Sequence, residues 1–200
     1  MPKVTGIFSS FENLDQIPIE DIAGNLEPAP VRYVLENYLA NKILYPAVVP
    51  VSGPQLNIDL AILREALKRS NVYYNLRSKK IFVPEAFFNF IPDVKKLALL
   101  FIDAYEPKGI ITFVLTRSGR DEILGTLVTV YCKGQKEPLH FGVEGQNFRI
   151  KPGVLTILPC PKEHCHVSFK ATEAKLLGKS EMLFEVPGGA LGLVVDGRWM

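Results

Sequence analysis

Apolar side chains recur at helical spacing in the first half of the chain. The first such stretch begins after Pro30 and ends before Pro46, and its apolar positions on one face are Val31, Val34, Leu35, Tyr38, Leu39 and Ile43. The same spacing predicts two further helices, over about 56–69 and 92–107. Residues 45–54 hold three prolines, which favour an extended connection over a helix. The β-branched run Ile110–Leu115 predicts a buried strand, so that the first half forms an α/β layer.

The pattern changes after Gly125. Short apolar segments are separated by Gly, Pro and charged turns, and the strands they predict cover 127–131, 139–143, 148–150, 154–158, 166–170, 182–186 and 191–195. This spacing is typical of a small all-β sandwich or barrel. We therefore expect an α+β chain with three parts: an acidic N-terminal arm over 1–27, an α/β half-domain over 28–125 and a C-terminal β domain over 126–200.

Charge distinguishes the arm from the rest of the chain. The 200 residues carry a net charge of +2, which is too small to indicate a nucleic-acid partner. Residues 1–30 hold one lysine and five acidic residues, a net charge of −4, so the remainder holds +6. The arm also contains Phe8, Phe11 and Leu14, which would suit a docking segment for a protein partner. The alternative is a strand and loop that pack against the chain's own basic body.

The other end of the chain offers a second candidate contact. The tail contains Asp196, Arg198 and the single tryptophan, Trp199. Tryptophan and arginine are favoured anchors of protein interfaces. A tail that folds back on its own β domain is the alternative.

Residues 160–166 form the densest group of potential metal ligands. The segment holds Cys160, Glu163, His164, Cys165 and His166, which are ligand types that zinc prefers. A metal-dependent enzyme using Cys160, His164 and His166 is therefore an alternative function. On a strand, however, Cys165 would point away from the two histidines, so a plain strand edge without metal is the expectation.

Other features bear on compartment and cofactors. The three cysteines cannot all pair within one chain, and the N-terminus lacks a signal-peptide pattern, so we expect a cytoplasmic protein with reduced thiols. The longest apolar run, Leu97–Ile102, is far shorter than the roughly 20 residues of a membrane span. The sequence contains neither a Walker-type loop nor a G-x-G-x-x-G motif, so no nucleotide or other cofactor is expected.

Several short strings resemble one family. They are Val154–Pro161, Val186–Arg198, Asp103–Gly109 with the pattern D-A-x-x-P-x-G, Ile123–Leu127, Val31–Leu35, Asn41–Pro46 and Ala61–Leu67. Together they are similar to the C-terminal part of the glutamate mutase accessory (methylaspartate mutase L) family. The resemblance implies a partial actin-like ATPase-type fold and an association with a coenzyme-B12-dependent mutase.

The same resemblance argues against ATP hydrolysis. The family's N-terminal half, with its phosphate motif, has no counterpart in these residues, and Ile81–Asn89 lacks the glycines that the family has there. We therefore predict a non-catalytic partner-binding or assembly subunit with no catalytic residue. Half of a nucleotide site, completed by another subunit, is a further alternative, and the sequence leaves the oligomeric state open.

Overall fold

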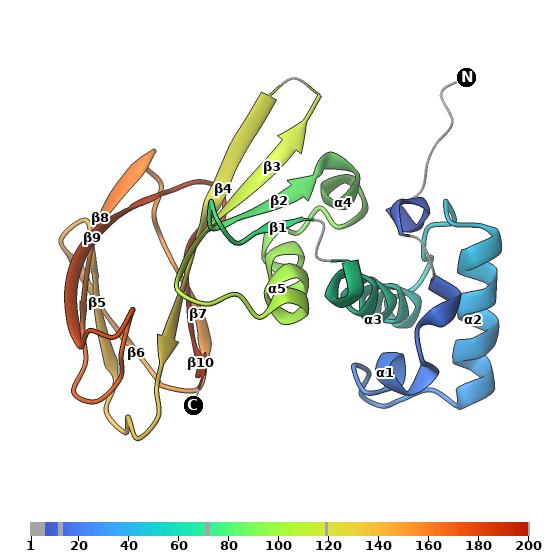
Figure 1. Ribbon diagram of the computed structural model, residues 1–200, viewed down its shortest axis with the longest axis horizontal. Helices are drawn as coiled ribbons and strands as arrows, with labels where there is room; N and C mark the ends of the chain where they lie inside the picture. The colour runs from blue at the N-terminus through green and yellow to red at the C-terminus, as the bar shows by residue number, and fades with distance from the viewer. Residues whose placement is uncertain (1–6, 12–13, 71–72, 119, 200) are drawn as a thin grey trace. The chain divides into compact units, whose positions relative to one another are not determined.

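The chain divides into two compact units, one helical and one built of strands. The computed structural model describes all residues except 1–6, 12–13, 71–72, 119 and 200 (Figure 1). Unit 1 comprises residues 1–73 and 85–106, and unit 2 comprises 74–84 and 107–200. Every helix described lies in unit 1 and every strand in unit 2. The α+β fold class predicted from the sequence is confirmed.

Unit 1 is a small helical assembly. Its elements are the 3₁₀ turns η1 (Ile7–Ser10) and η2 (Leu14–Gln16) and the helices α1 (Ile19–Ala23), α2 (Arg32–Leu44), α3 (Gly53–Ser70), α4 (Glu85–Phe90) and α5 (Val94–Tyr105). The three long helices lie where the apolar spacing predicts them. The arm contains turns and a short helix, where the sequence suggested a strand and loop. In Figure 1, α2 forms an outer edge of this unit.

Local chemistry explains the bounds of α5. The Asp93 side chain accepts hydrogen bonds from the backbone N–H groups of Lys95 at 2.9 Å and Lys96 at 3.3 Å, which satisfies donors that lack a partner within the helix. The helix ends at Glu106, whose φ of 44° lies in the left-handed region. Between these ends, α5 buries Leu97, Phe101 and neighbouring apolar side chains.

Unit 2 contains two sheets. The six-stranded sheet has the order β1-β2-β3-β4-β10-β7, and its strands are β1 (Tyr74–Asn75), β2 (Lys80–Pro84), β3 (Ile110–Arg117), β4 (Arg120–Tyr131), β7 (Leu155–Leu158) and β10 (Gly192–Trp199). The four-stranded sheet has the order β6-β5-β8-β9, with β5 (Leu139–Val143), β6 (Gln146–Ile150), β8 (His164–Lys170) and β9 (Glu181–Pro187). The pairs β2–β3 and β4–β10 are parallel, and the other pairs are antiparallel.

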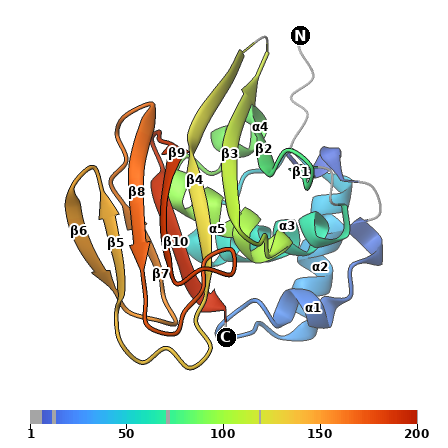
Figure 2. The same ribbon diagram turned by 60° about the vertical axis from the view of Figure 1, so that its left-hand side comes forward.

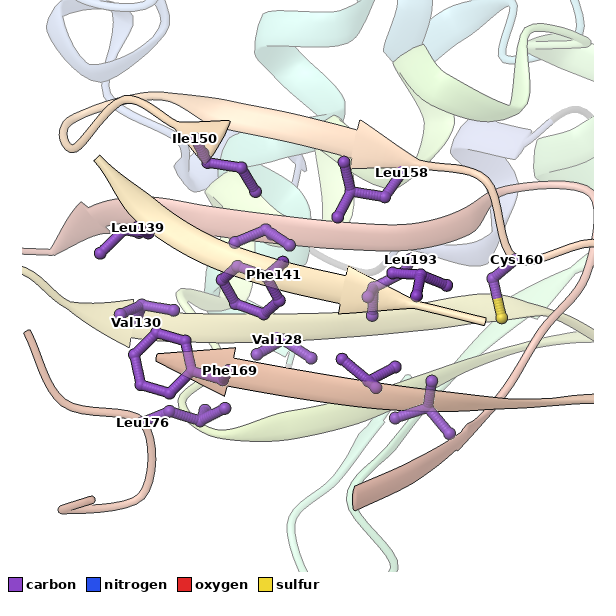
Figure 3. Close-up of a cluster of buried hydrophobic side chains, with 14 of the residues drawn as sticks. Val128, Val130, Leu139, Phe141, Ile150, Leu158, Cys160, Phe169, Leu176 and Leu193 are labelled. Atoms are coloured by element: carbon purple, nitrogen blue, oxygen red, sulfur yellow. The ribbon is translucent and has the colours of Figure 1, made fainter. Parts of the chain in front are cut away.

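One apolar core joins the two sheets, which lie one over the other in Figure 2. Val128, Val130 and Leu193 of the larger sheet face Phe141 and Phe169 of the smaller one (Figure 3). The two phenylalanine rings lie 5.1 Å apart between centroids. Alternating burial along β8 follows from the two-residue repeat of a strand. Of the two architectures that the sequence allowed, the β region has that of a sandwich.

The compact units differ from the domains expected from the sequence. The expected boundary at residue 125 falls inside β4, because β3 and β4 pair antiparallel from Ile110 with Val128 to Arg117 with Arg120. The strand Ile110–Leu115 thus belongs to the β unit, and the helices form a unit of their own.

Two glycines allow close approach of backbone segments in unit 2. Gly192 has a φ of 75°, and a side chain there would meet the Leu158 carbonyl oxygen. A side chain at Gly188 would meet the carbonyl oxygens of Lys162 and Cys160. Glycine at these two positions thus permits the close backbone contact.

None of the helices described combines the length and the apolar character that a membrane crossing demands.

Candidate interaction surface

Helix α2 and the loop after it present large apolar side chains to solvent. We call these residues the α2 surface; their exposed fractions range from 37% to 90%, and they are Val31, Tyr33, Val34, Ile43, Leu44, Tyr45, Val48, Val49 and Val51. They account for most of the exposed large apolar side chains described. Single exposed apolar residues are common, but clusters of them are a feature of binding surfaces, so the α2 surface is the candidate site.

The buried face of α2 is not the one that the sequence predicted. Leu35 and Leu39 are buried as expected, but the third buried residue of the helix is Lys42. Val31, Val34 and Ile43, which were expected on the core face, are 65%, 37% and 41% exposed. The helix carries apolar residues on two sides, and spacing alone does not decide which side packs inward.

A buried ion pair holds the loop after α2. The Lys42 ammonium lies 2.7 Å from Asp59 Oδ2 of α3, and both side chains are almost fully buried. The same ammonium donates a hydrogen bond to the carbonyl oxygen of Val48 at 2.6 Å. Lys42 therefore connects α2, α3 and the exposed apolar loop, and we call Lys42, Asp59 and Val48 the loop clamp.

Aromatic rings and further hydrogen bonds surround the loop clamp. Lys42 Nζ lies 5.0 Å from the ring centroid of Phe8 and 5.6 Å from that of Tyr38, distances at which cation–π attraction acts. The Tyr38 hydroxyl donates to the Gln55 carbonyl oxygen at 3.2 Å, and Gln55 Oε1 accepts from the Val51 backbone N–H at 2.9 Å. The loop is thus attached to the helices at both Val48 and Val51.

Burial dominates the electrostatics at the loop clamp. Loss of hydration raises the pKa of the Asp59 carboxyl, while the Lys42 ammonium acts in the opposite direction. Burial and the Asp59 charge raise the pKa of the Tyr38 hydroxyl. Removing two charges from water is costly unless they remain paired. Burying the Lys42–Asp59 pair therefore costs folding free energy, and the buried pair keeps the loop in one position.

A groove of about 640 Å³ lies elsewhere in unit 1, between α3, α5 and residues 25–30. Its lining includes Arg64 and Lys96 as well as Glu27 and Asp103, so charge selects no class of ligand there. The α2 surface, which is apolar over a continuous stretch of chain, is the better-defined candidate.

The predicted contact residues of the arm lie inside unit 1. Phe8 and Leu14 are buried, and Phe11 is half-buried, with its ring 6.0 Å from that of Phe87. Two acidic residues of the arm form ion pairs at 2.7 Å, Glu20 with Arg32 and Asp21 with Arg69. The sequence left two interpretations of the arm open, a docking segment for a partner and a segment packed against the chain's own basic body; the described part follows the second, since it packs against the chain's own cations and core. The Phe8 ring lies beside the Lys42 ammonium of the loop clamp.

The predicted contact residues of the tail belong to β10, a strand that lies between β4 and β7. Asp196 is 1% exposed and accepts hydrogen bonds from the exposed Arg198 guanidinium. Trp199 is half-buried, with Lys108 Nζ 5.1 Å from its ring centroid. The tail thus folds back on its own β unit, which was the alternative reading of this segment.

The cysteine and histidine cluster does not converge on a common point. Cys160 and Cys165 form a disulfide with a Cα–Cα distance of 5.9 Å, which corrects the expectation of reduced thiols at these two residues. His164 and His166 are exposed, and His164 lies 3.7 Å from Glu185. Across the described residues, no group of three His, Cys, Asp or Glu side chains is placed to hold a metal ion. The Cys160 sulfur is engaged with Cys165, so this structure leaves it no thiolate to offer a metal.

Sequence reasoning missed the α2 surface, although a signal was present. Residues 43–51 contain no charged side chain, whereas connections between helices are usually polar. The prolines of this segment led to the prediction of an extended connection, and the apolar residues between them were not considered as a surface. The burial of Lys42 depends on Asp59, which is 17 residues away in the sequence.

Comparisons with family models, with curated proteins and with solved structures found no match to this chain. The resemblance to the glutamate mutase accessory family therefore stays a prediction that rests on the residues quoted for it.

Proposed function

We propose that this protein is a non-catalytic binding or assembly subunit that binds a protein partner through the α2 surface. The observation that carries the proposal is the continuous exposure of apolar side chains from Ile43 to Val51. Covering such side chains removes apolar area from water, at roughly 25 cal/mol per Å². This gain is the main driving force of protein association.

The loop clamp supports the proposal because it fixes the loop before a partner arrives. Lys42 holds the carbonyl oxygen of Val48, and Gln55 holds the backbone N–H of Val51. A surface held in its bound conformation loses little conformational entropy when it binds. The buried ion pair thus contributes to binding as well as to the fold.

The test compares complexes isolated from the native host. Tagged wild-type protein and a Val49→Asp/Val51→Asp variant are purified in parallel, and the bound proteins are quantified by mass spectrometry. Both side chains are largely exposed, so the variant is expected to fold normally. We expect the specific partners recovered with the wild type to be depleted on the order of 100-fold with the variant, because two charges would be buried in an apolar contact.

Leu183→Asp is the matched control, since Leu183 is 82% exposed and belongs to unit 2. This control should recover the same partners as the wild type. Equal recovery of partners by the wild type and the α2 variant would contradict the proposed function.

A further inference from the structure

The outer face of the four-stranded sheet (Figure 2) contains a hollow of about 470 Å³. Its polar lining residues are Asn147 of β6, His166 and Ser168 of β8 and Glu185 of β9. Gly142 of β5 lies between them, opposite Asn147 on one side and Ser168 on the other. The whole hollow belongs to unit 2, so it is a different site from the α2 surface of unit 1.

Gly142 is an unusual residue for the interior of a strand. Glycine weakens a strand, and it is found there at bulges, at bends or where a ligand or another backbone comes close. The pairing of β5 with β6 and with β8 is regular on both sides of Gly142. The three atoms nearest to a Cβ placed at Gly142 all belong to the side chains of Ser168 and Asn147. The glycine therefore opens a space that polar side chains surround.

Two of these side chains have hydrogen-bonding capacity to offer a ligand. Within the part of the chain that the structure describes, neither the Ser168 hydroxyl nor the Asn147 side-chain amide has a hydrogen-bond partner in the protein. The exposed His166 imidazole lies two residues from Ser168 on the same face of β8. Hydroxyl, amide and imidazole groups both donate and accept hydrogen bonds. The hollow thus suits a ligand that carries several hydroxyl groups.

A row of basic side chains lies beside the hollow on the same face. Arg149 of β6, His140 of β5 and Lys170 of β8 are opposite one another in the sheet, and all three are exposed. Each is two residues along its strand from a residue of the hollow, which places the row about 7 Å away. Lys170 pairs with Glu181 at 3.7 Å. Arg149 and His140 are therefore the groups best placed to bind phosphate oxygens.

We infer that this face of the sheet binds a phosphorylated sugar, with its phosphate at Arg149 and His140 and its hydroxyl groups in the hollow. The volume of 470 Å³ lies within the range of roughly 300–1,000 Å³ that is typical of small-molecule sites. Glu185 does not oppose the phosphate, because β9 and β6 are the two opposite edges of this sheet. Its carboxylate can accept hydrogen bonds from sugar hydroxyls.

Ligand-observed NMR followed by isothermal titration calorimetry tests the inference on the full chain. The probes are hexose and pentose monophosphates, the same sugars without phosphate, and inorganic phosphate. We expect at least one sugar phosphate to bind at least about tenfold more tightly than its parent sugar and than inorganic phosphate, because it alone contacts both rows. Absence of binding by every sugar phosphate at millimolar concentration would overturn the inference, and so would equal affinities for the sugar phosphate and inorganic phosphate.

Three variants test the position of the site. Arg149→Gln should weaken binding of the sugar phosphate about tenfold, and Ser168→Ala about fivefold, because a charged and a neutral hydrogen bond are lost. Lys175→Gln is the matched control, since it removes the same charge from an exposed residue that pairs with β4 of the other sheet. It should bind as the wild type does, and circular dichroism spectra should show that all three variants are folded. Equal affinities of the Arg149→Gln and Lys175→Gln variants would overturn the assignment of the site.

Discussion

Helix α2 and the outer face of the four-stranded sheet distribute polar and apolar side chains in opposite ways. Apart from Leu183, which is 82% exposed, the outer face of the sheet presents mainly polar side chains such as His140, Arg149, His166, Lys170 and Glu185, while Phe141, Val167 and Phe169 of the same strands are buried. On α2 a lysine is buried, and Tyr33 and Leu44 are more than 60% exposed. Burial of apolar area explains the sheet on its own. The helix would follow the same principle with its surface covered by the partner that we propose.

The sheet and the helix also differ in their ion pairs, which are exposed on the sheet and buried beside the helix. Lys170 and Glu181 pair across β8 and β9 at 3.7 Å, with side chains 71% and 70% exposed. Exposed pairs of this kind contribute little because water screens them. The Lys42–Asp59 pair is buried, and it also holds the exposed loop through Val48. Its loss should affect both stability and binding, whereas loss of the surface pair should affect neither.

Replacing Lys42 should have the largest effect on stability. Lys42→Met leaves the Asp59 carboxylate buried without its partner, so the free energy of unfolding should fall by about 3–5 kcal/mol. Lys170→Met, the matched change on the sheet, should stay within about 0.5 kcal/mol of the wild type. Urea unfolding followed by far-ultraviolet circular dichroism measures both. Equal free energies of unfolding for the two variants would contradict the difference between the buried ion pair and the surface ion pair.

Adding Asp59→Leu to Lys42→Met should restore much of the lost stability, because an apolar pair replaces the isolated charge. Binding should not recover, since no ammonium remains to hold the Val48 carbonyl oxygen. Recovery of both properties would show that the loop clamp does not position the loop.

The strands of unit 2 could be predicted from the sequence because local residue patterns mark them. For example, Leu139–Val143 was expected as a strand and is found with the same bounds. Turn residues separate the strands, and some strands, such as β8, alternate in burial, so local sequence carries both signals. The helix α4 was missed, because its aromatic residues have no helical period and it owes its place to packing, as in the Phe87–Phe101 contact at 5.2 Å.

The candidate surface could not be predicted in the same way. Local sequence shows that α2 is a helix, but Leu35 and Val34 are equally apolar, and only the fold decides which is buried. The arm illustrates the same limit, because Phe8 finds neighbours in Phe90 and Lys42, far along the chain. Contacts between residues far apart in the sequence determine which side chains form the candidate surface, whereas the local spacing of apolar residues determines most of the helices and strands.

The disulfide should contribute less than the loop clamp. Cys160 and Cys165 are five residues apart, and closing so short a loop stabilises a fold by about 2 kcal/mol. Cys160→Ala/Cys165→Ala should therefore reduce the free energy of unfolding by this amount. A thiol titration of the unfolded, unreduced wild type should find one thiol, that of Cys132. Three titratable thiols would show that the bond does not form.

The smallest effect expected is the pH dependence due to Glu144. Hydrogen bonds from Lys162 and from the His166 backbone N–H lower the pKa of the Glu144 carboxyl below its ordinary value of 4.5. A carboxyl whose pKa is lowered in the folded state stabilises the fold when the pH is above the ordinary pKa of the group. This contribution to the free energy of unfolding is lost as the pH falls through the lowered pKa of the folded state. Glu144→Gln should thus be less stable than the wild type at neutral pH, and the gap should close in acid. A gap that is constant with pH would exclude this origin.

The contrast between the two regions rests on the claim that protein covers the α2 surface in the assembled state. Hydroxyl-radical footprinting tests this most directly, because Tyr33 and Tyr45 are 63% and 61% exposed in the single chain. The rates of modification of both tyrosines are compared between the dilute purified chain and the complex isolated from its host. We predict at least about fivefold protection of both in the complex, while exposed Leu183 stays equally reactive. Equal modification of Tyr33 and Tyr45 in the two samples would contradict the account.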